Sequence, residues 1–275
     1  MKKLILMISL LPLLAYAYIP SADFIFSKVV QNSGKGVYQI KQELSFQARD
    51  RAVTVTETWW VQSENSMFLK VEGPLFTQYY LYKNGKKYFF NSDGKFVSSS
   101  LPKDFYENLF FYRASQSLKE SLISKKIIPV QIFKKRPVIK NSKEPAPLVN
   151  EPYLKLSRFK GSVTFLMGQA AQNEQSPGLW VEQDRFLIKK VRFPSQAEVS
   201  ADTYSELSRG LIYPKTQTVS WDKESVMIEL SRADAINKGT EYLEESNFSK
   251  LANQNRPLPQ DLTAGVVADF YKRFR

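Results

Sequence analysis

Residues 76–90, FTQYYLYKNGKKYFF, contain two aromatic and apolar runs separated by Asn84-Gly85. An Asn-Gly pair favours a type I′ hairpin turn, because both central residues of that turn need a positive φ. The stretch therefore predicts two antiparallel strands, 76–82 and 87–90, joined by a tight turn. Asp93-Gly94 repeats the turn signal directly before Phe96-Val97, which extends the predicted antiparallel meander.

The residues before this hairpin alternate between apolar and polar side chains with a period of two. That period is typical of a strand with one buried face. Strands are therefore predicted near 38–46, 53–61 and 67–71, and Glu57 interrupts the apolar face of the second. The apolar positions are Tyr38, Ile40, Leu44 and Phe46 in the first strand, Val53, Val55, Trp59 and Val61 in the second, and Met67, Leu69 and Val71 in the third.

The rest of the chain mixes helical and strand patterns. Ser117 and Glu120 match a capping box at the start of one predicted helix. Helical spacing is found at 21–29, at 104–112, at 117–123 and in the tail at Leu262, Val266 and Phe270. Further strands are predicted at 163–167, 179–181, 186–193, 211–221 and 226–230. These patterns together predict a mainly β protein with covering helices.

The composition excludes many functions. The 275 residues include no Cys and no His, with 39 Lys+Arg against 27 Asp+Glu and a formal net charge of +12. Without these two residue types there is no Ser-His-Asp triad, thiolate nucleophile, disulfide, or metal site with His or Cys ligands. A binding protein that needs no metal or cofactor is therefore favoured, and an enzyme acting through carboxylates is the remaining catalytic alternative.

The N-terminus predicts export. Lys2 and Lys3 precede an apolar run from Leu4 to Leu14, which Ala15-Tyr16-Ala17 follows. This pattern is typical of a secretory signal peptide, with cleavage predicted after Ala17 and an exported mature protein. An N-terminal membrane anchor is the alternative, but the run is shorter than the roughly 20 apolar residues of a bilayer span. The predicted organisation is a signal peptide at 1–17, one domain at 18–250 and a helical tail at 251–275.

A proline-rich basic insertion is predicted near 125–152. Its basic side chains suit contact with an anionic membrane surface, where each nearby lysine contributes about 1 kcal/mol. A solvated loop is the alternative, and nucleic acid is disfavoured because an exported protein seldom meets it and no nucleic-acid-binding motif is present. The candidate membrane-contact residues are Lys134, Lys135, Arg136 and Lys140.

The apolar face of the first strands has two interpretations. Trp59, Met67 and Leu69 project from neighbouring strands on the same face. They can form an ordinary core beneath the helices, or they can line a cavity for an apolar ligand in a strongly curved sheet. Periodicity alone is compatible with both.

Several strand segments resemble the LolA-like superfamily of periplasmic lipoprotein carriers and outer-membrane lipoprotein-sorting proteins. The resemblance covers roughly Gly36 to Phe248, and the basic insertion and the tail lie outside it. In the first half it is carried by Trp60-Val61-Gln62, by 67–71 (MFLKV) and by 80–90 (YLYKNGKKYFF), and in the second half by 178–184 (GLWVEQD), 211–215 (LIYPK) and Val219-Ser220-Trp221.

The resemblance implies an unclosed antiparallel β-barrel, with helices covering a concave apolar face that receives acyl chains. Family carriers typically have a lid-latching arginine shortly after the Trp-Val pair, where this chain has residues near Ser63. The positions that match cavity-facing residues of the family are Val61, Met67, Leu69 and Val71, and Trp59 joins them by alternation.

The expected function is that of an exported, non-catalytic carrier of lipid or lipoprotein acyl chains in outer-membrane lipoprotein sorting. A cell-envelope scaffold or interaction protein with a filled core is the alternative. A filled concave face favours the scaffold, an open one favours the carrier, and two carboxylates converging in a wet cleft favour an enzyme.

Overall fold

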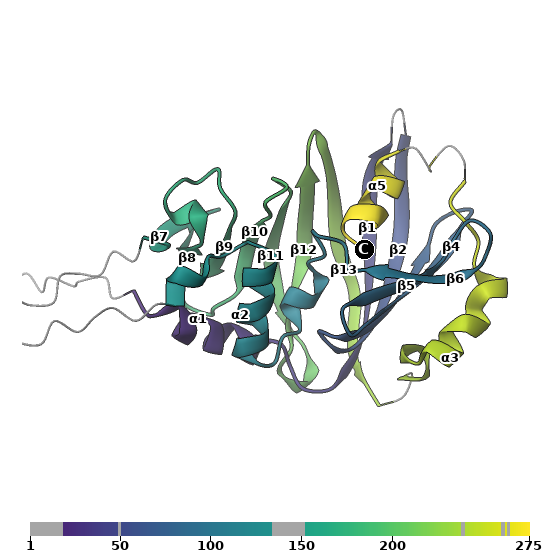
Figure 1. The fold of residues 1–275 in the computed structure, drawn as a ribbon, viewed down its shortest axis with the longest axis horizontal. Coiled ribbons are helices and arrows are strands. Elements are labelled where there is room, and N and C mark those ends of the chain that lie inside the picture. The colour runs from purple at the N-terminus through teal and green to yellow at the C-terminus, as the bar shows by residue number, and fades with distance from the viewer. Residues whose placement is uncertain (1–18, 49–50, 134–151, 238–239, 260–261, 263–264) are drawn as a thin grey trace, which may run out of the picture.

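The computed structural model describes residues 19–48, 51–133, 152–237, 240–259, 262 and 265–275. Thirteen strands form a single antiparallel sheet with the order β6-β5-β4-β3-β2-β1-β13-β12-β11-β10-β9-β8-β7. β1 and β13 meet in the middle, and successive strands step outward from them on both sides (Figure 1). β6 and β7 are the two edges, so the curved sheet is not closed, as predicted.

The strands occupy most of both halves of the chain. In the first half they are β1 (Val37–Ala48), β2 (Arg51–Ser63), β3 (Ser66–Glu72), β4 (Thr77–Lys83), β5 (Lys86–Phe90) and β6 (Phe96–Ser100). In the second half they are β7 (Leu154–Phe159), β8 (Ser162–Met167), β9 (Gly178–Glu182), β10 (Ile188–Arg192), β11 (Glu198–Glu206), β12 (Ile212–Trp221) and β13 (Glu224–Ile236).

The register of the first strands gathers their apolar residues on one face. Trp59 of β2 lies opposite Ile40 of β1 on one side and opposite Leu69 of β3 on the other. The turn between β4 and β5 has φ angles of 50° at Asn84 and 77° at Gly85, which are the positive values that a type I′ turn needs. The hairpin predicted from 76–90 is therefore confirmed.

Helices cover both faces of the sheet. The α-helices are α1 (Ala22–Val29), α2 (Ser115–Ser124), α3 (Glu245–Phe248) and α5 (Val266–Arg273). The 3₁₀ helices are η1 (Val30–Asn32), η2 (Glu107–Phe110), η3 (Val130–Phe133), η4 (Gln169–Ala171), η5 (Ser208–Gly210), η6 (Thr240–Leu243) and η7 (Ser249–Gln254). Among the described residues, no helix has the length and apolar character of a bilayer span.

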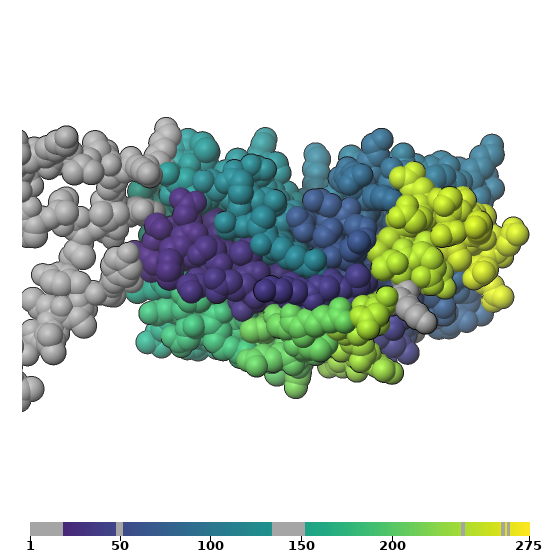
Figure 2. Space-filling model, turned by 90° about the horizontal axis from the view of Figure 1, so that it is seen from below, coloured from purple at the N-terminus to yellow at the C-terminus, as the bar shows by residue number. Residues whose placement is uncertain are grey.

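The largest hydrophobic core lies on the concave face. Buried residues of α1, α2, α5 and the segment around η2 pack there against the inward side chains of the strands. Figure 1 shows α1, α2 and α5 lying over the same face of the sheet. Seen from below, the segment that contains α1 lies between α2 and the strands of the second half (Figure 2). The prediction of helices over the concave face is confirmed. A smaller core on the opposite face joins Phe68 and Leu81 to Leu243, Phe248 and Leu251.

Some local predictions were wrong. The helix expected at 104–112 is only the short η2, because every residue from Asp104 to Tyr112 is buried and a regular helix would turn part of them to solvent. Helix α2 starts at Ser115, so Ser117 lies inside it and forms no capping box. Strand β11 was not anticipated, because only Val199 and Ala201 along it are buried.

Candidate functional site

The five predicted cavity residues lie together on the concave face. Neighbouring strands β2 and β3 carry them, and the register places Val61 opposite Met67 and Trp59 opposite Leu69. Each of the five side chains, Trp59, Val61, Met67, Leu69 and Val71, is 0% exposed. The structure therefore brings them into one apolar surface that other parts of the chain cover. Their role in ligand binding remains a prediction.

The C-terminal segment, Gly265–Arg275, packs beside this surface against β1, β4 and β12 and reaches Trp59 through Arg275. The Phe270 ring packs edge-on against Phe46 of β1, with 5.4 Å between the ring centroids. Tyr271 stacks on Tyr80 of β4 at 6.1 Å, and Phe274, 0% exposed, belongs to the same core. Helix α5 thus fills the hollow of the sheet with aromatic side chains, and the concave face in this structure is occupied.

Arg275 binds two acidic residues inside the core. Its side chain and those of Glu57 and Glu107 are 0% exposed. The guanidinium Nε lies 3.0 Å from Glu57 Oε1, and one terminal nitrogen lies 2.9 Å from Tyr106 Oη and 3.7 Å from Glu107 Oε2. The guanidinium also lies 5.3 Å from the ring centroid of Trp59, a predicted cavity residue. We call Arg275, Glu57 and Glu107 the buried ionic cluster.

Further hydrogen bonds reach both carboxylates of the cluster. Gln42 Nε2 donates to Glu57 Oε2 at 2.7 Å, and Trp59 Nε1 donates to the same oxygen at 3.0 Å. Tyr213 donates its hydroxyl proton to Glu107 Oε1. These bonds explain how Glu57, which interrupts the apolar alternation of β2, is accommodated in an apolar face.

Burial shifts the pKa values of two charged groups around the C-terminal segment. It raises the pKa of Glu107 to about 7, although Arg275 and the hydrogen bond from Tyr213 act in the opposite direction. It lowers the pKa of Lys87 to about 7, and the positive charge of Arg275 adds to this effect. The Lys87 ammonium donates to the backbone oxygens of Tyr271, at 3.1 Å, and of Arg275. Lys87 therefore fixes the end of helix α5 from the β5 side.

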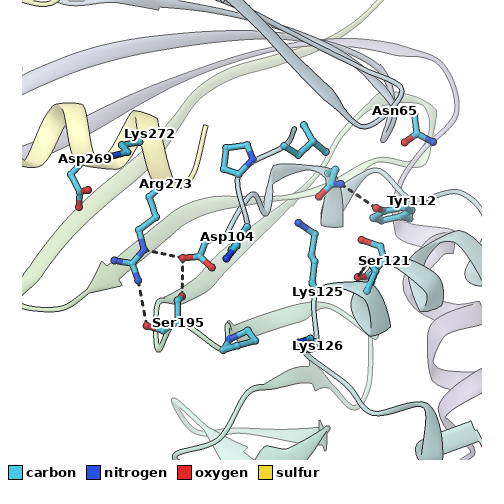
Figure 3. Close-up of a pocket in the computed structure, with 16 residues that line it drawn as sticks. Asn65, Asp104, Tyr112, Ser121, Lys125, Lys126, Ser195, Asp269, Lys272 and Arg273 are labelled. Carbon is cyan, nitrogen blue, oxygen red and sulfur yellow. Dashed lines mark hydrogen bonds and ion pairs between the residues drawn. The ribbon is translucent and has the colours of Figure 1, made fainter. Parts of the chain in front are cut away.

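A second feature is a cleft of about 920 Å³ beside the C-terminal segment, which we call the basic cleft (Figure 3). Residues after β6, the end of α2, the turn between β10 and β11, and helix α5 line it. Five of the lining side chains are basic and two are acidic. The charged residues are Lys103, Lys125, Lys126, Lys272, Arg273, Asp104 and Asp269.

Both carboxylates of the basic cleft are engaged within the protein. Asp104 Oδ2 lies 2.8 Å from Arg273 Nε and accepts a 2.8 Å hydrogen bond from the Ser195 hydroxyl. Asp269 accepts a 2.6 Å hydrogen bond from Trp221 Nε1. Figure 3 shows Arg273 reaching from α5 toward Asp104 and Ser195. This contact holds helix α5 against the wall of the cleft.

Lys125 contributes a partly buried positive charge to the cleft. Its ammonium donates to the carbonyl oxygen of Phe105 at 2.8 Å. Burial lowers its pKa to about 8, against the opposing effect of Asp104. Among the described residues, no carboxylate forms an ion pair with Lys125 or with Lys103, Lys126 and Lys272.

The structure clarifies which site residues the sequence could reveal. Glu57 was visible as a break in the alternation of β2, but Arg275 and Glu107 gave no signal, because they reach the cluster from distant segments. The predicted membrane-contact residues Lys134, Lys135, Arg136 and Lys140, and the predicted signal peptide at 1–17, lie outside the described residues.

The buried ionic cluster does not have the arrangement expected of a catalytic pair. Glu57 and Glu107 are fully buried and share Arg275, whereas acid–base catalysis needs access to a substrate. Within the described part of the chain, no three His, Cys, Asp or Glu side chains are grouped as metal ligands. The buried ionic cluster therefore suits a structural role.

The fold defines a class of protein, an open antiparallel half-barrel whose concave apolar face is covered by helices. Two solved structures have this fold: the LolA superfamily protein NE2245 from Nitrosomonas europaea and a putative outer membrane lipoprotein-sorting protein domain from Vibrio parahaemolyticus. Each has a TM-score of 0.50 and 10% sequence identity, covering 83% of this chain and 99% and 97% of the respective structures.

The predicted LolA-like fold is thereby confirmed at the level of structure. No protein-family model matches the sequence. No curated protein matches it either. At 10% identity the likeness shows the fold alone, so the function must be argued from the site.

Proposed function

We propose that this protein is an exported, non-catalytic carrier that binds the acyl chains of lipids or lipoproteins on the concave face. The observation that carries the proposal is that separate helical segments, rather than a second sheet, cover the apolar surface of β2 and β3. The likeness to a LolA superfamily protein and to a putative outer membrane lipoprotein-sorting protein domain supports it. Outer-membrane lipoprotein sorting is the process in which we place this carrier.

Uptake of an acyl chain requires one cover to leave the concave face. We assign this role to the C-terminal segment, because Arg275 lies against Trp59 and Tyr271 stacks on Tyr80, which pairs with Leu69 in the sheet. Displacement would uncover Trp59, Phe46 and Tyr80 on the concave face and let water reach the buried ionic cluster. The segment thus acts as an internal substitute for the acyl chain when no ligand is bound.

The cellular location that we propose rests on the sequence. The basic and apolar N-terminus supports export to the periplasm, with Tyr18 as the first residue after cleavage. Lys134, Lys135, Arg136 and Lys140 are proposed to contact the anionic surface of a membrane, from which the carrier would take its cargo. Neither nucleic acid nor a cofactor takes part in the proposed function.

The proposal is tested with a neutral fluorescent acyl ester and the full mature chain. Unmodified protein should bind the probe at micromolar concentration, and the double variant Phe270→Ala/Phe274→Ala should bind it more tightly, because the competing side chains are smaller. Leu69→Trp should weaken binding by filling the uncovered surface. Phe248→Ala, on the opposite face, is the matched control and should leave affinity unchanged. Absence of binding in all four proteins would contradict the proposal.

A second function, that of a cell-envelope scaffold, is favoured by the complete burial of the five predicted cavity residues. In a permanently filled core, Leu69→Ala should cost about 2–5 kcal/mol of stability and Leu69→Trp about 1–3 kcal/mol. A scaffold should carry no lipid. Mass spectrometry of lipids extracted from natively purified protein separates the two functions, since only a carrier should contain acyl chains in stoichiometric amounts.

A further inference from the structure

The basic cleft has more positive charge than its own carboxylates neutralise. The Arg273 guanidinium forms ion pairs with Asp104, at 2.8 Å, and with Asp222, at 3.1 Å. With Asp269 bonded to Trp221, both carboxylates in the lining are occupied. The remaining basic groups, Lys103, Lys125, Lys126 and Lys272, converge on one space from three different segments. Such an excess in a concave site favours an anionic ligand.

One of these lysines is placed at a conformational cost. Lys126 has a φ of 56°, in the left-handed region that a residue other than glycine adopts with strain. It directly follows Lys125 at the end of α2, and both side chains line the cleft. The tight turn thus places Lys125 and Lys126 next to each other in the lining of the cleft.

Asn108 supplies an independent indication of a ligand. The residue lines the basic cleft and is only 3% exposed. Its Nδ2 donates to the Tyr112 hydroxyl at 3.1 Å, whereas its Oδ1 is buried with no hydrogen-bond partner. An unpaired buried acceptor is costly. A ligand that offers a hydroxyl donor would satisfy this acceptor while the lysines bind its charge.

Helix α5 connects this cleft with the concave face. Lys272 and Arg273 line the cleft, while Phe270 and Phe274 of the same segment lie in the apolar core. A molecule with an anionic, hydroxylated end and an apolar chain would therefore meet the matching chemistry on the two sides of one helix.

We propose that the basic cleft binds a phosphate group that carries a free hydroxyl, the chemistry of a glycerophosphate lipid headgroup. The lysines bind the phosphate oxygens, and Asn108 Oδ1 accepts from the hydroxyl. The lipid as the source of this headgroup rests on the proposed function, whereas binding of the headgroup itself does not.

Calorimetry with the full mature chain tests the headgroup chemistry with three soluble probes. sn-Glycerol 3-phosphate should bind more tightly than inorganic phosphate, and uncharged glycerol should not bind. Lys125→Gln and Lys272→Gln should each lower the affinity for sn-glycerol 3-phosphate about tenfold, which is the effect of losing one charge-assisted hydrogen bond. Lys272 is exposed, so its substitution is expected to leave the fold intact. Lys41→Gln, an exposed lysine on β1, is the charge-matched control and should have no effect.

The Asn108→Leu variant tests the hydroxyl contact separately. It should reduce the affinity for sn-glycerol 3-phosphate to that for inorganic phosphate and leave phosphate binding unchanged. No phosphate binding at millimolar concentration, or an equal loss in Lys41→Gln, would overturn the inference. So would an unchanged preference for the glycerol ester in Asn108→Leu.

Vesicles distinguish a lipid from a soluble phosphate ester. Vesicles containing phosphatidylglycerol should displace bound sn-glycerol 3-phosphate, and pure phosphatidylcholine vesicles should not. Binding of the soluble ester without displacement would overturn the lipid source. The neutral acyl ester keeps the two proposals apart: loss of acyl binding with intact headgroup binding defeats the carrier function alone, and the reverse result defeats the cleft assignment alone.

Discussion

The buried charge of Glu57 is neutralised by a residue more than 200 positions away in the sequence. The Arg275 guanidinium bonds both Glu57 oxygens, at 3.0 and 3.2 Å, and Trp59 and Gln42 donate to the same carboxylate. A buried ion pair adds little net stability when it is compared with an apolar pair of the same shape, but a single unpaired member is costly. The cluster therefore fixes where the C-terminal segment docks more than it stabilises the fold.

A double-mutant cycle tests this interpretation. Arg275→Met should destabilise the protein by about 3–5 kcal/mol, because it leaves Glu57 without its partner charge. Glu57→Gln should destabilise it less, because Arg275 keeps Glu107 as a partner. The double variant should cost clearly less than the sum of the two. Urea unfolding followed by tryptophan fluorescence gives the three values. Lys70→Met, which breaks the partly exposed 2.7 Å pair with Glu72, is the control and should cost less than about 1 kcal/mol. Additive costs at Glu57 and Arg275 would contradict the coupling.

The shifted pKa values of Glu107 and Lys87 predict opposite pH effects on stability. The folded-state pKa of Glu107, about 7, lies above its ordinary 4.5, so the folded protein binds the proton more tightly and stability falls as pH rises from 4.5 to 7. The folded-state pKa of Lys87, about 7, lies below its ordinary 10.5, so stability rises between pH 7 and 10.5. For each group, the unfolding free energy changes by at most about 1.4 kcal/mol per pH unit.

The combined contribution of Glu107 and Lys87 to the free energy of unfolding therefore has its minimum near pH 7. Unfolding free energies measured from pH 4.5 to 10.5 should lose the falling part in Glu107→Gln and most of the rising part in Lys87→Met. A pH profile of Lys87→Met identical to that of the unmodified protein would show that Lys87 is not desolvated in solution.

At the scale of elements, strands and turns followed from the sequence better than the covering segments did. The alternation of β1 to β3 and the Asn84-Gly85 turn are local patterns, and local sterics decide them. The path of 104–112 depends on which inward-facing strand residues it meets, so its helical spacing was misleading. Helix α5 was expected from its spacing, but its position inside the hollow depends on partners such as Glu57 that periodicity does not identify.

Two glycines show how much a turn depends on its surroundings. Gly85 has a φ of 77° and open space where a Cβ would lie, so Gly85→Ala should cost only the backbone strain, about 1 kcal/mol. Gly168 has a φ of 102°, and a Cβ there would lie 2.6 Å from the carbonyl oxygen of Ile127. Gly168→Ala should therefore lower the melting temperature distinctly more than Gly85→Ala. Equal shifts would mean that the chain near Ile127 moves aside without cost.

At the scale of the molecule, an acyl chain and the C-terminal segment gain comparable free energies when they pack into the hollow of the sheet. A sixteen-carbon acyl chain gains about 12 kcal/mol on full burial, at ~0.8 kcal/mol for each CH₂. Withdrawing Phe270, Tyr271 and Phe274 costs about 5–9 kcal/mol by the same scale, before the ionic cluster is counted. One long chain can therefore compete with the C-terminal segment. The exchange is then reversible, as a carrier that must release its cargo requires.

Hydrogen exchange shows directly whether the acyl chain and the C-terminal segment compete for the concave face. When a neutral acyl ester saturates the protein, the amides of Val266–Arg273 should exchange faster, because the helix loses the surface that stabilises it. The amides of β2 and β3 should keep their protection, since their ladder hydrogen bonds are unchanged. Helix α3, on the opposite face, is the internal control and should show no change. Slower exchange throughout α5 on probe binding would mean that the ligand packs onto the segment instead of replacing it, and the acyl site would then have to lie elsewhere on the half-barrel.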